Sequence, residues 1–212
     1  MTIRLSNLAR GLIGSEILKI AAEVRELMAQ GRPVCNLTVG DFSPKEFRIP
    51  ERLARSTVDY IQHGETNYPP SPGVPELRKA VVEFYRRWLG LEYDTSNVIV
   101  TSGGRPVIYG AYMTVVNEGE RVVYPVPSWN NNHYARIVGA NAVEVPCDAS
   151  TDFLPTAAML REAVRGATLL ALNSPSNPTG TLFSEKMLAE ICDLVLEENA
   201  RRGANNRPLY LL

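Results

Sequence analysis

The pattern of hydrophobic and polar positions changes near residue 97. Before it, apolar residues recur every three or four positions, a spacing that predicts amphipathic helices. Ser15 is the expected N-cap of the first helix, and Gly90 is the expected stop of the third. The pattern predicts three helices, over 15–30, 50–63 and 75–89, and a short strand between the first two, over 34–39.

From residue 97 onward, short apolar runs alternate with helical patterns. The expected strands cover 98–101, 121–124, 142–145, 168–172 and 207–212. The expected helices cover 106–116, a short segment ending near 138, 155–164 and 184–201. Unbroken apolar strands that alternate with helices predict an α/β fold, in which helices cover both faces of a mainly parallel sheet.

A polar stretch from Asn173 to Gly180, with the sequence Asn-Ser-Pro-Ser-Asn-Pro-Thr-Gly, follows the fourth of these strands. Its two prolines cannot continue a strand ladder, so the chain must turn there. The turn leaves amide side chains at the carboxyl end of the strand, where open α/β sheets bind ligands. An isolated Asn-Pro turn is more often an ordinary connection than part of a ligand site. The other connections of the predicted sheet are therefore needed to choose between these two interpretations.

A second connection, Ser102-Gly103-Gly104-Arg105, joins a strand to a helix. Its glycines permit close backbone approach, and the amides of Gly104 and Arg105 at a helix start could hold a phosphate. A plain turn is the alternative. The segment has neither the spaced glycines of dinucleotide folds nor a P-loop lysine, which disfavours a nicotinamide dehydrogenase or an NTPase.

A third connection carries Trp129. A tryptophan at the carboxyl end of a strand could stack on a flat heteroaromatic ring, although a partly buried core tryptophan is the alternative. His133 lies nearby in a run of asparagines and has no assigned role, since polar surface is the more common place for such a histidine.

Composition excludes several classes of partner. The net charge of −1 gives no electrostatic reason to expect nucleic acid or an anionic membrane. No apolar run approaches a spanning helix, and the first residues lack a signal-peptide core. The three cysteines are too far apart for a disulfide framework or a zinc cluster. We therefore expect a cytoplasmic protein without a metal site.

Taken in order, five short segments resemble the class I aminotransferases of pyridoxal-phosphate fold type I, which include aspartate aminotransferase. The segments are Leu37-Thr38-Val39-Gly40, Asn67-Tyr68-Pro69-Pro70-Ser71-Pro72-Gly73, Val100-Thr101-Ser102-Gly103-Gly104, Pro127-Ser128-Trp129 and the stretch from Asn173 to Gly180. The resemblance covers about residues 37–200. It implies an incomplete large domain that binds pyridoxal 5'-phosphate over 46–212, preceded by an N-terminal arm and a small-domain segment over 1–45.

The resemblance also implies a role for each matching residue. Asn177 would bond to the hydroxyl oxygen of the cofactor ring and lie near the α-carboxylate of the substrate. Trp129 would stack on the pyridine ring. The remaining roles are turn formation by Ser102 and Gly103, phosphate binding by Gly104 and Arg105, a substrate carboxylate pocket at Gly40, and contact from Tyr68 to the phosphate in a neighbouring subunit. This last role requires a homodimer with shared active sites.

The resemblance places three further groups after the asparagine stretch: the Schiff-base lysine, a carboxylate against the pyridine nitrogen and an arginine for the substrate. The four lysines of the chain, Lys19, Lys45, Lys79 and Lys186, lie in helical patterns or a charged loop and do not match that lysine. We therefore expect no catalytic residue in this chain. Because it ends on an apolar strand, we expect the N-terminal half of an enzyme, inactive alone.

The implied reaction transfers an amino group between an α-amino acid and a 2-oxo acid. A pyridoxal-phosphate-dependent lyase or synthase of the same fold is one alternative, because one scaffold hosts several reactions. A non-catalytic amino-acid-sensing domain is another, although the first 14 residues leave no room for a DNA-binding domain. A fragment that acts only as an interaction module is the third.

Overall fold

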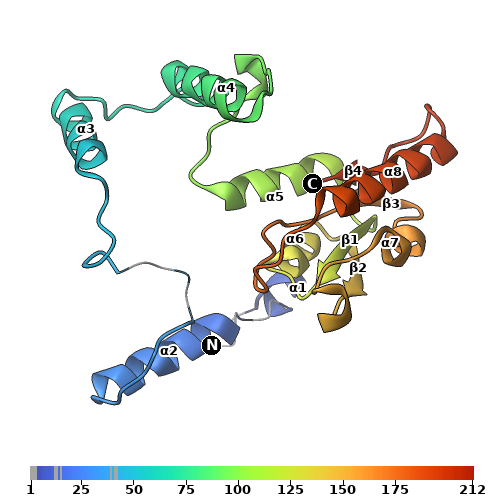
Figure 1. Ribbon diagram of the computed structural model, residues 1–212, viewed down its shortest axis with the longest axis horizontal. Helices are drawn as coiled ribbons and strands as arrows, with labels where there is room; N and C mark the ends of the chain where they lie inside the picture. Colours follow the sequence, from blue (N-terminus) through green and yellow to red (C-terminus); the bar gives the residue numbers. More distant parts are fainter. Residues whose placement is uncertain (1–3, 12–13, 15, 39, 41–42) are drawn as a thin grey trace. The chain divides into compact units, whose positions relative to one another are not determined.

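The structure is a computed structural model that describes residues 4–11, 14, 16–38, 40 and 43–212 (Figure 1). It separates into two compact units. The sheet unit comprises Thr101–Leu212 with the described part of Met1–Arg10, and the helical unit comprises the described part of Gly11–Val100. The boundary that we expect near residue 45, between a small-domain segment and a large domain, stays a prediction.

The sheet unit alternates strands and helices as the sequence predicts. Its helices are α1 (Asn7–Arg10), α5 (Gly104–Val115), α6 (Asn131–Ile137), α7 (Ala157–Ala163) and α8 (Glu185–Arg202), and a 3-10 turn, η2, spans Ala149–Thr151. Its strands are β1 (Arg121–Val126), β2 (Asn141–Pro146), β3 (Ala167–Leu170) and β4 (Tyr210–Leu211). The expected strand over 207–212 is thus shorter than predicted.

The four strands form one sheet in the order β2-β1-β3-β4, and every neighbouring pair is parallel. In the register, Val123 lies opposite Val143 on one side and Leu170 on the other. A parallel sheet of this kind brings the carboxyl ends of β1, β3 and β4 to one edge. The predicted parallel sheet is confirmed.

Alternation along β1 divides its side chains between two cores. Val122 and Tyr124 pack with residues of α5 and α6, whereas Val123 packs with residues of α7 and α8. All three side chains are almost completely buried. Burying a side chain of this size contributes about 1.5–3 kcal/mol, so both covered faces stabilise the sheet. The prediction that helices cover both faces is confirmed (Figure 1).

Side-chain caps set the starts of two of these helices. Ser184 Oγ accepts a hydrogen bond from the Met187 amide at 3.2 Å, and Thr156 Oγ1 accepts one from the Met159 amide at 3.3 Å. Each cap satisfies one amide that the first helical turn leaves free. The helix α8 therefore begins at Glu185, five residues after the end of the stretch from Asn173 to Gly180.

The helical unit contains α2 (Glu16–Ala29), α3 (Glu51–Gln62), α4 (Pro75–Leu89) and a 3-10 turn, η1 (Thr95–Asn97). All three predicted helices are confirmed. Gly90 ends α4 in the left-handed region, with φ of 65°. The predicted N-cap Ser15 lies outside the described residues.

Two predicted strands of this unit are wrong. Residues 34–38 form no strand, and residue 39 lies outside the described residues. Residues 98–101 also form no strand; instead, the Val100 amide donates to the Pro72 carbonyl at 2.9 Å. Among the described residues, neither segment has a neighbouring strand, and extended backbone needs such a ladder partner.

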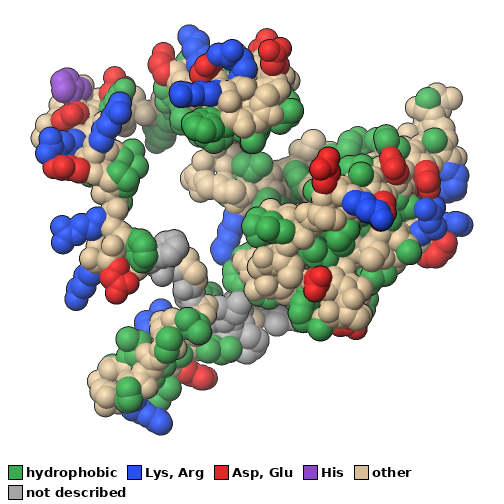
Figure 2. Space-filling model, viewed as in Figure 1, with side chains coloured by type: hydrophobic (Ala, Val, Ile, Leu, Met, Phe, Trp, Pro, Cys, Tyr) green, Lys and Arg blue, Asp and Glu red, His purple; other side chains and the backbone are tan. Residues whose placement is uncertain are grey.

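Most apolar side chains of the helical unit are exposed. Phe84 and Trp88 on α4 are 55% and 65% exposed, and among the described residues of the unit Ala21 is the one buried hydrophobic residue. Figure 2 shows apolar side chains gathered on the surface of its helices. No helix among the described residues is long and apolar enough to span a membrane.

Candidate cofactor site

A cavity of about 380 Å³ lies at the carboxyl edge of the sheet unit. This volume is in the usual range for small-molecule sites. Three connections that lead into helices or loops meet around it: the segment before α5, the connection after β1 and the one after β3. The lining residues are Arg105, Ile108, Trp129, Asn131, Tyr134, Ala171, Leu172, Asn173, Pro175, Asn177 and Leu212.

The first connection forms the start of α5. Gly103 has φ of 106°, a conformation that favours glycine, and Thr101 Oγ1 donates to its carbonyl at 2.7 Å. The helix begins at Gly104, two residues earlier than the sequence predicts. Its first-turn amides have no partner within the helix, so those of Gly104 and Arg105 can bind an anion.

Arg105 and Trp129 lie side by side in the cavity wall. The guanidinium carbon of Arg105 is 6.0 Å from the centroid of the Trp129 ring, which is a cation–π contact. The arginine side chain is exposed and the tryptophan is half-buried. The arrangement places a positive charge and a flat aromatic ring in the wall of the cavity.

The third connection is a closed loop that presents Asn177. The Asn177 amide donates to Asn173 Oδ1 at 2.9 Å. The Gly180 amide donates to the Ser176 carbonyl at 2.7 Å, and the Ser176 amide donates to the Thr181 carbonyl at 2.8 Å. Because none of these bonds uses the side chain of Asn177, its carboxamide stays available for a ligand in the cavity.

The structure thus brings together Arg105, Trp129 and Asn177, three of the residues that the sequence predicts for the site. Ser102, Gly103 and Gly104 immediately precede Arg105 at the start of α5. Tyr68 and Gly40 belong to the helical unit; Tyr68 is fully exposed and Gly40 lies between residues outside the described part. Their roles stay predictions.

Several wall residues are absent from the sequence prediction. Asn131, Tyr134, Asn173 and Leu212 line the cavity, whereas His133 on α6 is not among the lining residues that the structure describes. Asn131 and Tyr134 are one helical turn apart, a spacing that could have drawn attention to this face of α6. None of the described residues in the lining is a lysine.

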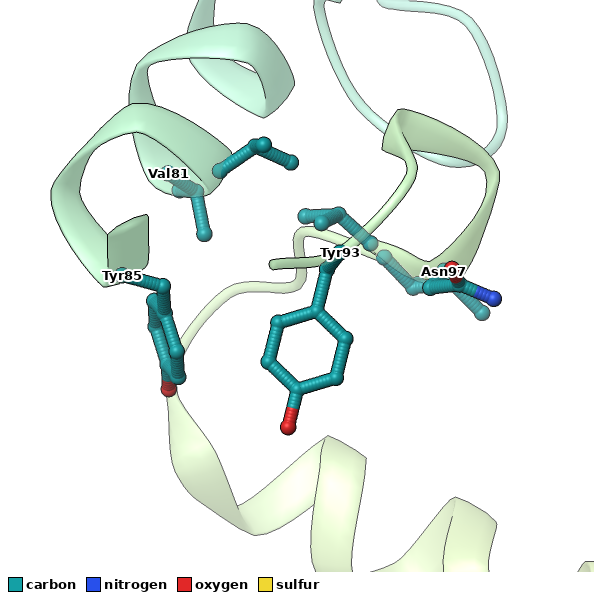
Figure 3. Close-up of a pocket in the computed structure, with 7 residues that line it drawn as sticks. Val81, Tyr85, Tyr93 and Asn97 are labelled. Carbon is teal, nitrogen blue, oxygen red and sulfur yellow. The ribbon is translucent and has the colours of Figure 1, made fainter. Parts of the chain in front are cut away.

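A second cavity, of about 340 Å³, lies within the helical unit between α4 and the segment after it (Figure 3). It is lined by Val81, Val82, Tyr85, Tyr93, Asn97, Val98 and Ile99. The rings of Tyr85 and Tyr93 meet edge to face, with centroids 5.8 Å apart. No charged side chain belongs to the described lining, so this cavity lacks the groups that a phosphate needs.

A parallel sheet with helices on both faces and a polar cavity at its carboxyl edge defines an α/β ligand-binding fold. The family described as aminotransferase class I and II matches residues 32–201. The chain belongs to that family, which confirms the resemblance seen in the motifs. Members of this family use pyridoxal phosphate.

Similar proteins agree with this assignment. The chain is 32% identical over 197 residues to an aspartate aminotransferase of Bacillus sp. (strain YM-2), a match that covers 92% of the chain and 50% of that relative. A solved aspartate aminotransferase from Rhizobium meliloti has a TM-score of 0.86 at 30% identity, covering 99% of this chain and 50% of the other. One from Thermus thermophilus, solved with maleate, has a TM-score of 0.87 at 28% identity.

Each match covers only part of the similar protein's length. The chain spans about half the length of the curated relatives it matches. The solved structures show the same proportion, with 50% and 52% of those two chains covered. The likeness is therefore to the N-terminal half of an aminotransferase.

Proposed function

We propose that this chain is the N-terminal part of a cytoplasmic, pyridoxal-phosphate-dependent aminotransferase that transfers an amino group between an α-amino acid and a 2-oxo acid. Because the chain spans half of its relatives, the activity, substrates and partners of the whole protein belong to the proposal. The relatives named above are all aminotransferases, which favours transamination over a lyase or a sensor.

One observation carries this proposal. Arg105, Trp129 and Asn177 come from three separate connections, yet they line one cavity. They supply a positive charge, an aromatic ring and a carboxamide, and these are the kinds of group that a phosphorylated hydroxypyridine needs. The same three residues also occur along the chain in the order of the family's motifs. Three side chains that met around an unrelated cavity by chance would not be expected to follow that order.

The donor set fits the cofactor. The first-turn amides of α5 and the Arg105 guanidinium would hold the phosphate, because a dianion suits both a helix start and a cation. Arg105 is exposed, so its guanidinium can leave the indole and reach a phosphate. Trp129 would stack on the ring, and Asn177 would donate to the ring hydroxyl oxygen. When bound, the cofactor supplies an electron sink for the substrate carbon.

The proposed partner is a second copy of the chain, in a homodimer with shared active sites. Tyr68 supports it, because a fully exposed tyrosine in the helical unit is available to a neighbouring subunit. Gly40 would line the substrate carboxylate pocket. Several relatives are named aspartate aminotransferase, which makes aspartate the first amino donor to assay.

The test measures two properties of the protein produced from its natural gene: its affinity for pyridoxal phosphate and its transamination activity. Arg105→Ala and Asn177→Ala are expected to weaken the binding of pyridoxal phosphate about tenfold or more, because each removes a hydrogen bond to a charged group. Equilibrium dialysis measures the affinity, and a coupled assay with aspartate and 2-oxoglutarate measures the activity.

Two matched variants serve as controls. Arg165→Ala removes an exposed arginine whose ion pair with Glu162 lies outside the cavity. Asn205→Ala removes an exposed asparagine from the turn after α8. Both controls should bind the cofactor as the unchanged protein does. Cofactor binding that is absent, or unaffected by both site variants, would contradict the proposed function.

A further inference from the structure

A buried tyrosine reaches the wall of the candidate cavity from the core. Tyr112 on α5 is completely buried, and its hydroxyl donates to Asn131 Oδ1 at 3.0 Å. Its ring packs on Tyr134, with centroids 5.5 Å apart. Asn131 and Tyr134 both line the cavity. One core residue therefore holds two residues of the wall.

The hydroxyl of Tyr112 fixes which way the carboxamide of Asn131 faces. Burial, together with the neighbouring Tyr134, raises the pKa of Tyr112, so the phenol is protonated at neutral pH and can donate. The oxygen of Asn131 accepts the hydrogen bond from this hydroxyl, and the two N–H groups of its nitrogen stay free to donate. No hydrogen bond among the described residues uses that nitrogen.

The unused N–H groups of Asn131 Nδ2 are available to an acceptor on a ligand in the cavity. The start of α5 and Arg105 already provide for a phosphate. Asn131 is the first residue of α6 and follows Trp129, the proposed ring-stacking group, by two residues. The acceptor that suits its position is therefore an anionic oxygen outside the phosphate.

We propose that Asn131 is a second carboxamide of the ligand site, which donates from Nδ2 to a non-phosphate anionic oxygen, and that Tyr112 is its positioning residue. This inference rests on the proposed function. The oxygen belongs either to the hydroxyl of the cofactor ring or to a carboxylate of the substrate. The binding measurements below distinguish these two sources.

The key variant is the double substitution Tyr112→Phe with Asn131→Leu. It replaces both hydrogen-bonding partners with apolar groups of similar shape, a change that can be nearly neutral for stability. It also removes the donor from the cavity. We expect thermal unfolding close to that of the unchanged protein, and affinity for pyridoxal phosphate or for maleate lowered about tenfold.

Single variants separate positioning from direct contact. Tyr112→Phe leaves Asn131 in place without its orienting bond, so a loss of about threefold is expected, smaller than for Asn131→Leu. If Tyr112 acts through Asn131, the double variant binds no more weakly than Asn131→Leu alone. Tyr124→Phe is the matched control, because Tyr124 is also buried, donates to Glu144 at 3.0 Å and does not line the cavity.

Three probes are measured on the protein produced from its natural gene: pyridoxal phosphate, maleate in the presence of cofactor, and inorganic phosphate. Weaker binding of pyridoxal phosphate assigns the oxygen to the cofactor ring, and weaker binding of maleate alone assigns it to the substrate. Affinity for inorganic phosphate should not change in either case. The natural protein must bind pyridoxal phosphate, since otherwise the proposed function itself fails.

The inference is overturned if the double variant binds pyridoxal phosphate and maleate as tightly as the natural protein. It is also overturned if affinity for inorganic phosphate falls in parallel, because the cavity as a whole has then been disturbed. A loss of equal size in Tyr124→Phe would contradict it as well. These outcomes leave the roles proposed for Arg105 and Asn177 untouched.

Discussion

The sheet unit and the helical unit use similar amphipathic elements with opposite results. In the sheet unit, Leu160 on α7 is completely buried against the sheet and α8. In the helical unit, Leu53 on α3 is 58% exposed and Trp88 on α4 is 65% exposed. The sheet unit therefore carries its own core, whereas most large apolar side chains of the helical unit are exposed among the described residues. A periodic sequence predicts a helix in both units, but burial depends on what the helix can pack against.

The largest expected difference between the units is in core truncation. Leu160→Ala should lower the free energy of unfolding by about 3 kcal/mol, because it removes buried methyl groups and leaves a cavity. Leu53→Ala should change it by less than about 0.5 kcal/mol, since an exposed side chain gains little from folding. Urea unfolding measures both. Equal losses would show that α3 is packed as firmly as α7.

The second difference concerns ion pairs. Glu198 on α8 is 5% exposed and accepts hydrogen bonds from Arg201, Arg202 and the Gly166 amide, and these donors hold its pKa at about 2 although burial raises it. In the helical unit, Glu83 pairs with Arg86 on the surface of α4, which also lowers the pKa of Glu83.

Glu198→Gln should cost about 2 kcal/mol at pH 7, whereas Glu83→Gln should cost nothing measurable because water screens an exposed pair. A depressed carboxyl pKa stabilises the fold above its unfolded value of 4.5, and that contribution is lost as the pH falls toward about 2. The cost of Glu198→Gln should therefore shrink between pH 5 and pH 3. A cost that is constant over this range would contradict the assignment.

The smallest expected difference is between two glycines. Gly90 ends α4 with φ of 65°, so Gly90→Ala should destabilise the helical unit by about 1 kcal/mol through backbone strain. Gly110 lies inside α5, and an added Cβ would meet no atom within 4 Å. Gly110→Ala should therefore stabilise the sheet unit by about 0.5 kcal/mol. Thermal unfolding should show shifts of opposite sign.

The sequence predicts most of the sheet unit because its strands are continuous apolar runs that find neighbours within the unit. Val122, Val123 and Leu170 are examples, each buried by a neighbouring strand and a helix. The strands predicted over 34–39 and 98–101 have similar composition. They fail in the described residues because strand formation depends on a ladder partner, which local composition does not specify.

The candidate site also combines residues that the sequence predicts with a contact that it does not predict. Arg105, Trp129 and Asn177 are predicted from the sequence because each lies in or directly beside one of the short segments that resemble the family. Nothing in the local pattern predicts the bond between Tyr112 and Asn131, because the two residues are 19 positions apart and meet only when α5 and α6 pack on the same face of the sheet. Contacts of this kind follow from tertiary packing.

The central claim is that the cofactor site belongs to the sheet unit, and the two tryptophans of the chain test it directly. Trp129 lines the cavity, and Trp88 lies on α4 of the helical unit. In Trp88→Phe the remaining fluorescence comes from Trp129, and in Trp129→Phe it comes from Trp88. Titration with pyridoxal phosphate should quench Trp129 strongly and saturably while Trp88 changes little. Saturable quenching of Trp88 with none at Trp129 would contradict the account.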